Sequence, residues 1–159
     1  MTTLTVDVQV ACDDPDIPAE ADIQTWVDAA VQQSGRSIGG DCEVGVRIVD
    51  ADEIRTLNKL YREQDKATNV LSFPAGEIEG LPEDAGRLLG DIVVCASIVS
   101  AEAAEQGKQQ AHHWGHILVH GTLHLLGFDH GTDAEAAQME GLESKILVAR
   151  NVTDPYEPS

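Results

Sequence analysis

The chain has 159 residues, of which 42% are hydrophobic and only 4% are aromatic, and this predicts one domain with a core of aliphatic side chains. Collagen-like, disulfide-scaffold and fully disordered chains are excluded by the same composition. The formal net charge of -18 at pH 7 repels polyanions at long range, so a general nucleic-acid binder is not expected, although a few well-placed cations can still recognise RNA locally.

Cysteine usage and hydropathy predict the compartment. The three cysteines lie far apart in the sequence and form no Cys-x-x-Cys pair, which favours buried free thiols in a reducing environment. The first residues lack a basic segment followed by an apolar one, and the longest uncharged stretch is far shorter than the ~18 residues of a membrane span. We therefore expect a soluble, cytoplasmic protein with no membrane contact.

Hydrophobic periodicity predicts the elements of the first half. Apolar residues alternate with polar ones at about 3–10 and again at 43–49, which is typical of strands with one buried face. Between these strands, apolar residues at helical spacing predict an amphipathic helix over 19–35. A second helix is predicted over 50–64, with Asp50 or Asp52 as its N-cap.

Two short apolar runs, at 70–73 and 91–96, are typical of central strands. The segment between them, from Pro74 to Gly90, is rich in glycine, proline and acidic residues. We interpret it as a surface loop that is a candidate flap over a site.

Helices dominate the last third of the chain. They are predicted over about 97–107, over about 109–127, and from Thr132, which forms a capping-box pair with Glu135. Residues 151–159 are expected to form a flexible tail. The whole pattern predicts the α/β class in its α+β form, with a small mixed β-sheet of about four strands packed by about five helices.

All six histidines fall within the 19 residues from His112 to His130. His120 and His124 are four residues apart on a predicted helix, so their side chains share one face. Gly127, in a left-handed conformation, would end this helix and let His130 return toward the same point. Three imidazoles with a fourth position open to water are typical of catalytic zinc, so the spacing predicts that these three histidines hold a metal ion.

The other polar residues near this pattern have several interpretations. His116 lies one helical turn before the pair, where a role beside the ligands or a structural role is favoured over metal binding. His112 and His113 are interpreted as ordinary residues at the start of the helix. Asp129 either orients a ligand imidazole, accepts a proton from a bound water, or caps a helix.

The spacing His-x3-His-x2-Gly-x2-His also matches the long zinc-protease motif. Gly121, however, stands where those proteases carry the glutamate that serves as general base. Its absence counts against peptide hydrolysis.

A cluster of basic residues stands out in this acidic chain. Four of the ten lysines and arginines lie within twelve positions at helical spacing: Arg55, Lys59, Arg62 and Lys66. A solvated helix face is the simple explanation for any one of them. As a group they are the best candidates for binding phosphates, and Arg62 is preferred because a guanidinium can bind a phosphate bidentately.

Three blocks of this sequence resemble the YbeY family of bacterial endoribonucleases: HGTLHLLGFDH at 120–130, LNKLYREQDKATNVLSFP at 57–74 and LGDIVV at 89–94. The resemblance runs from about 43 to 147. By motif position, the metal-binding histidines of the family fall on His120, His124 and His130, and its functionally important arginine falls on Arg62. Asn69 stands where many relatives have Asp, and no catalytic role is assigned to it.

The resemblance implies a single metal-dependent endoribonuclease domain over 1–150, specific for single-stranded RNA. Its implied role is the hydrolysis of phosphodiesters in 3′-end maturation of small-subunit ribosomal RNA and in ribosome quality control. It also implies one zinc ion (Zn²⁺) per chain, with single-stranded ribosomal RNA and components of the small ribosomal subunit as partners.

Alternatives remain at the level of sequence. One is a non-catalytic ribosome-assembly factor whose zinc is closed by a fourth ligand such as His116, Asp129 or Cys95. Another is a zinc peptidase or amidase. For a nuclease, the proton acceptor also stays open between an acidified water, Asp129 and the 2′-hydroxyl of the RNA.

Overall fold

The computed structural model describes residues 4–35, 42–75, 87–150 and 152. Within these ranges the strands form a four-stranded mixed sheet that is packed by five helices, so the predicted α+β class is confirmed. The elements in chain order are β1 (Leu4–Val10), α1 (Glu20–Gln33), β2 (Cys42–Val49), α2 (Ala51–Arg62), β3 (Val70–Pro74), β4 (Arg87–Cys95), α3 (Ala96–Gln106), α4 (Gln110–Leu125) and α5 (Asp133–Val148).

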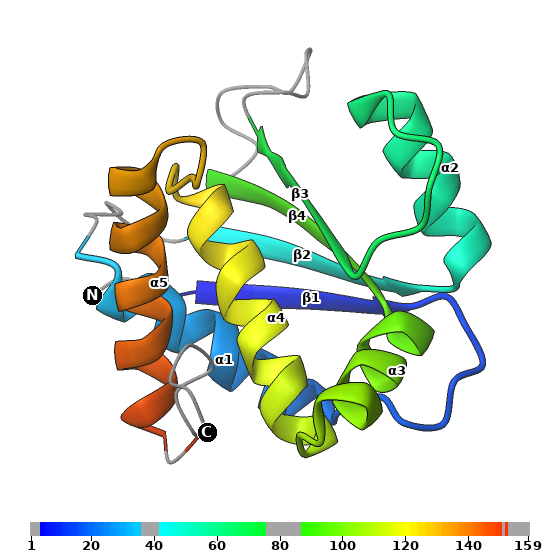
Figure 1. Ribbon diagram of the computed structural model, residues 1–159, viewed down its shortest axis with the longest axis horizontal. Helices are drawn as coiled ribbons and strands as arrows, with labels where there is room; N and C mark the ends of the chain where they lie inside the picture. The colour runs from blue at the N-terminus through cyan, green and yellow to red at the C-terminus, as the bar shows by residue number, and fades with distance from the viewer. Residues whose placement is uncertain (1–3, 36–41, 76–86, 151, 153–159) are drawn as a thin grey trace.

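The sheet has the strand order β1-β2-β4-β3, in which β1, β2 and β4 run parallel and β3 runs antiparallel to β4 (Figure 1). The parallel pair β1 and β2 is joined through α1, as a crossover connection requires. The antiparallel strand β3 therefore forms one edge, and this edge lies beside α4.

The strand predicted at 91–96 begins earlier, at Arg87, and this is a correction to the sequence analysis. Arg87 pairs with Cys42 at the start of β2, and the register shifts near Gly90, which has φ of +148°. Glycine and charged residues are not typical of strands, so the sequence pattern did not predict this part of β4. It forms a strand because it pairs with β2. Residues 76–86 of the predicted flap lie outside the described part of the chain.

Helices cover both faces of the sheet. On one face, Val44, Val46 and Ile48 of β2 join a core with α1 and α4. On the other face, Val93 and Leu71 pack with Ile54 of α2. Figure 1 shows α2 apart from the group formed by α1, α4 and α5.

Helix α5 completes a further layer by packing on α4 and α1. Three of its apolar side chains, Met139, Ile146 and Leu147, form a second core with Val119 and Leu123 of α4. Val152, which follows the end of α5, is buried in the same core. Helix α4 is thus surrounded by α1, α3, α5 and the sheet. The rest of the predicted tail, 151 and 153–159, lies outside the described residues.

Local capping signals operate as the sequence predicts. The Thr132 hydroxyl accepts a hydrogen bond from the backbone N–H of Glu135 at 3.1 Å, which starts α5. Gly127 has φ of +96°, and its N–H donates to the carbonyl of His124 after the end of α4. His130 consequently lies in a short connection that returns from α4 to α5.

The expectation of buried free thiols is met at two of the three cysteines. All three cysteines are free; Cys42 and Cys95 are buried and Cys12 is partly buried. Among the described helices, none combines the length and apolar character required to cross a membrane.

Candidate metal centre

Three histidines converge where α4 ends and the chain turns into α5. His120, His124 and His130 each offer one ring nitrogen, and these nitrogens all lie within 4.8 Å of one another. The Nε2 atoms of His120 and His124 are 3.2 Å apart. Two nitrogens bound tetrahedrally to one zinc ion would lie about 3.3 Å apart, given zinc–nitrogen bonds of about 2.0 to 2.1 Å. The cluster can therefore hold a metal ion.

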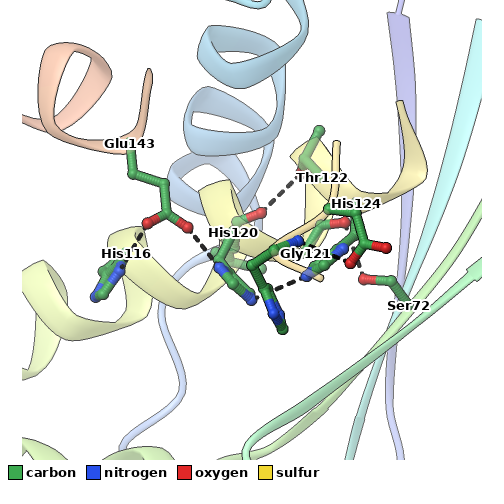
Figure 2. A network of polar contacts seen from close by, with 10 residues as sticks. Ser72, His116, His120, Gly121, Thr122, His124 and Glu143 are labelled. Atoms are coloured by element: carbon green, nitrogen blue, oxygen red, sulfur yellow. Dashed lines mark hydrogen bonds and ion pairs between the residues drawn. The ribbon is translucent and has the colours of Figure 1, made fainter. Parts of the chain in front are cut away.

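The ring of His120 is oriented by a carboxylate from α5. Its Nδ1–H donates a hydrogen bond to Oε1 of Glu143, a residue with 0% exposure (Figure 2). An ionised carboxylate can only accept a hydrogen bond, so an ionised Glu143 would place the ring proton of His120 on Nδ1. The lone pair of Nε2 is then directed toward His124.

The environment of His124 favours its neutral form. Burial lowers the pKa of this imidazole, and the neighbouring imidazoles of His120 and His130 lower it further. A metal ion binds the neutral imidazole, so a lowered pKa extends the pH range over which this ligand is available.

Of the three other histidines of α4, two contact carboxylates. Nε2 of His116 is 3.5 Å from Oε2 of Glu143, so this histidine contacts the carboxylate that orients His120. His113 is in the first turn of α4, as expected, but it is buried rather than exposed at the helix start, with a pKa lowered by burial. Its Nε2 lies 3.0 Å from Oε1 of Glu102, which also accepts from the side-chain amide of Asn69.

Arg62 shares one cleft with the histidine cluster. The cleft has a volume of about 630 Å³ and is lined by Arg62, the three histidines, Asp129 and residues of β3. The Nη2 group of Arg62 donates to the carbonyl of Ser72 at 2.7 Å, and its guanidinium carbon lies 4.8 Å from the centre of the Phe73 ring. Strand β3 thus holds the cation at the cleft wall.

The predicted basic face divides in the structure. Arg55 and Lys59 line a different surface of α2, where Arg55 forms an ion pair with Asp65 at 2.8 Å. Of the four basic residues, Arg62 is the one that lines the described part of the histidine cleft. A guanidinium at this place can bind a phosphate bidentately beside a metal ion.

Gly121 lies at the tight contact between α4 and the sheet. A Cβ atom there would lie 3.0 Å from Cγ2 of Ile92 and 3.3 Å from Oγ of Ser72. The Ser72 hydroxyl also donates to the Gly121 carbonyl at 2.9 Å (Figure 2). A glutamate at this position would point into the sheet, so the general base of zinc proteases has no room here.

The remaining candidates for a fourth ligand lie in different surroundings. Asp129 lines the cleft, and its Oδ1 accepts from the backbone N–H of His130 at 2.8 Å, which shapes the turn before that histidine. It does not cap α5, because Thr132 does. Cys95 is buried in the core on the α2 side of the sheet.

Glu143 was not predicted as a site residue from the sequence. A signal for it exists, because Glu143 shares a helix face with Met139, Ile146 and Leu147, all of them buried. A carboxylate within such an apolar stripe needs a polar partner. Only the packing of α5 on α4 reveals that its partners are histidines.

The fold and the site together define a small α+β protein with a candidate three-histidine metal centre and an arginine in one cleft. The family described as Endoribonuclease YbeY matches residues 8–151. The chain belongs to this family, and the resemblance noted in its sequence is confirmed.

Similar proteins cover almost the whole chain. Endoribonuclease YbeY of Halorhodospira halophila is 54% identical over 140 residues, which is 88% of each chain. That of Psychromonas ingrahamii is 47% identical over 154 residues, 96% of each chain. That of Alcanivorax borkumensis is 49% identical over 158 residues, 99% of this chain and 89% of the relative.

A solved structure shares the fold. The solution structure of a protein from Thermotoga maritima aligns with a TM-score of 0.51 at 23% identity, covering 95% of this chain and 99% of that one.

Proposed function

We propose that this protein is a zinc-dependent endoribonuclease that hydrolyses phosphodiester bonds of single-stranded ribosomal RNA. Its role would be in 3′-end maturation of the small-subunit RNA and in ribosome quality control. The observation that carries the proposal is the convergence of three histidines and Arg62 in one cleft. Membership of a family described as an endoribonuclease supports RNA as the substrate.

In the proposed site, His120, His124 and His130 would hold one Zn²⁺ per chain. A bound zinc ion would supply Lewis-acid stabilisation of the negative charge that develops on a phosphodiester. Three imidazole ligands leave a coordination position open, which is the pattern of catalytic rather than structural zinc.

Residues of the chain have separate tasks in this mechanism. Arg62, fixed by Ser72 and Phe73, would bind a phosphate oxygen and stabilise the transition state. Asp129 is the carboxylate among the described residues that line the cleft, and it is our candidate for the proton acceptor. We do not propose a peptidase, because Gly121 leaves no space for a base beside the first ligand.

The acidity of the chain has a consequence for its partners. A net charge of -18 opposes long-range attraction of RNA, so we propose that components of the small ribosomal subunit bring the protein to its substrate in the cytoplasm. Residues 1–150 would act as one domain in this role, together with Val152, which packs in the core between α4 and α5.

The test combines metal analysis with cleavage of a labelled single-stranded RNA by the full chain. We expect about one equivalent of zinc in the wild type and the loss of both metal and cleavage in His124→Ala. Arg62→Glu should keep the metal, and its cleavage rate should fall by about 10²- to 10³-fold, as expected when a donor that stabilises the transition state is removed.

Lys59→Glu is the matched control, because Lys59 lies on the same helix but lines another surface. It should cleave RNA as the wild type does. Bound zinc with background cleavage in every variant would overturn the nuclease proposal and favour the assembly-factor alternative. Wild-type zinc content in His124→Ala would overturn the metal centre.

A further inference from the structure

Glu143 is a fully buried carboxylate that contacts two histidines of the neighbouring helix. Its oxygens take different partners: Oε1 accepts from Nδ1–H of His120, and Oε2 lies 3.5 Å from Nε2 of His116. Met139 and Leu147, on the same face of α5, have exposures of 1% and 0%. A carboxylate is placed in such surroundings at a cost in free energy, which its hydrogen bonds must offset.

We propose that Glu143 is the positioning residue for the candidate ligand His120, an inference that rests on the proposed metal centre. A histidine has two ring nitrogens, and the one that holds the proton is unavailable to a metal. When Glu143 accepts a hydrogen bond from Nδ1–H of His120, the lone pair of Nε2 points toward His124. The Nε2 atoms of the two histidines are 3.2 Å apart. The carboxylate also makes this imidazole a more basic ligand.

His116 fixes the carboxylate itself. It precedes His120 by one helical turn, so the two rings meet the two oxygens of Glu143 from the same face of α4 (Figure 2). With both oxygens engaged, the carboxylate is held against rotation. This arrangement explains why a fourth histidine follows the spacing of the cluster without joining it.

A second histidine–glutamate pair, which links α4 to α3, provides a matched control. Nε2 of His113 in α4 lies 3.0 Å from Oε1 of Glu102 in α3, so this pair also joins a histidine of α4 to a carboxylate of a neighbouring helix. His113 does not belong to the cluster of possible ligands. Replacing Glu102 therefore removes a contact between a buried histidine and a partly buried carboxylate without touching His120.

The experiment compares zinc affinity in Glu143→Leu, Glu143→Gln and Glu102→Leu, measured by competition with a chromophoric chelator on the full chain. Leucine suits the apolar face of α5 but removes the acceptor, so we expect zinc affinity to fall by about 10- to 100-fold. Glutamine keeps an acceptor oxygen and should recover part of this loss. Glu102→Leu should bind zinc as the wild type does.

The proton position gives a readout that a merely structural role would not move. In the metal-free wild type, long-range proton–nitrogen NMR correlations should show His120 protonated at Nδ1. In Glu143→Leu the proton should redistribute to Nε2. Because the first measurement uses the wild type, it tests the proposal even if a variant does not fold.

Two results would overturn the positioning role. They are an Nε2 proton on His120 in the metal-free wild type, and unchanged zinc affinity in Glu143→Leu while His124→Ala loses zinc. The second result leaves the metal centre intact. Wild-type zinc binding by His124→Ala would instead overturn the centre and this inference together.

Discussion

Asp91 is a partly buried carboxylate at the start of the apolar part of β4, close to the backbone of β2. A Cβ atom on Gly45 would collide with Oδ1 of Asp91, so the neighbouring strand has a glycine where the carboxylate lies. Burial raises the pKa of Asp91, and the negative charges of Glu43 and Asp7 raise it further. At neutral pH the ionised form of Asp91 therefore reduces the free energy of unfolding.

We predict that Asp91→Asn raises the melting temperature at pH 7. The pKa in the folded state is raised above that of the unfolded chain, so the folded wild type takes up its proton first as the pH falls. The advantage of asparagine should therefore shrink as the pH falls through the raised pKa. Calorimetry of both proteins between pH 7 and pH 4 measures this difference.

Asp13→Asn is the control for the loss of one negative charge, because Asp13 is exposed. It should change the melting temperature less at pH 7. Equal shifts in the two variants, or a gain for Asp91→Asn that grows toward low pH, would contradict the assignment of the effect to burial.

At the residue scale, the sequence predicts the part of the site that depends on local spacing. His120 and His124 share a helix face because they are four residues apart, and Gly127 allows the turn that returns His130. Glu143 could not be assigned in this way. It lies 23 residues from His120 in the chain, so their contact depends on the packing of α5 against α4.

At the element scale, replacing two helical glycines with alanine should change the free energy of unfolding in opposite directions. A Cβ atom on Gly121 would press α4 against Ile92 and Ser72, whereas one on Gly141 of α5 meets nothing within 4 Å. We predict that Gly121→Ala lowers the free energy of unfolding by about 1 to 3 kcal/mol through overpacking. Gly141→Ala should raise it by about 0.5 to 1 kcal/mol, because alanine has the better helix propensity.

Urea unfolding of the two variants and the wild type tests this pair. Both changes add one methyl group to a helical glycine, so a difference of sign isolates the contact between α4 and the sheet. Stabilisation by both substitutions would show that α4 can move away from β3 without cost.

The elements predicted well are those with local signals. The capping pair of Thr132 and Glu135 starts α5, and the alternation of β1 and β2 matches their more buried faces except at Val10, which is 56% exposed. The start of β4 at Arg87 was missed, because it is formed by pairing with β2 rather than by an apolar pattern. The basic face of α2 was likewise predicted from helical spacing. In the structure, Arg55 pairs with Asp65, whereas Arg62 is bound by β3 at the cleft.

At the scale of the whole molecule, the cleft is assembled from segments distant in sequence. Arg62 comes from the end of α2, the wall from β3, and the histidines from α4 and the turn after it. The strand order β1-β2-β4-β3 brings β3 beside α4, and this order depends on pairings between distant segments. Composition and local periodicity gave the class of fold but did not give this order.

The net charge of -18 is also a property of the whole molecule, and it destabilises the compact state through self-repulsion. We predict that sodium chloride raises the melting temperature at pH 7.5, because going from about 10 mM to about 1 M shortens the Debye length from about 30 Å to about 3 Å. The control is the same titration near the isoelectric point of about 4.4, with a chelator present throughout to exclude divalent ions. There the repulsion largely disappears, so the salt effect should be much smaller. A salt effect of equal size at both pH values would show that screening of the net charge is not its cause.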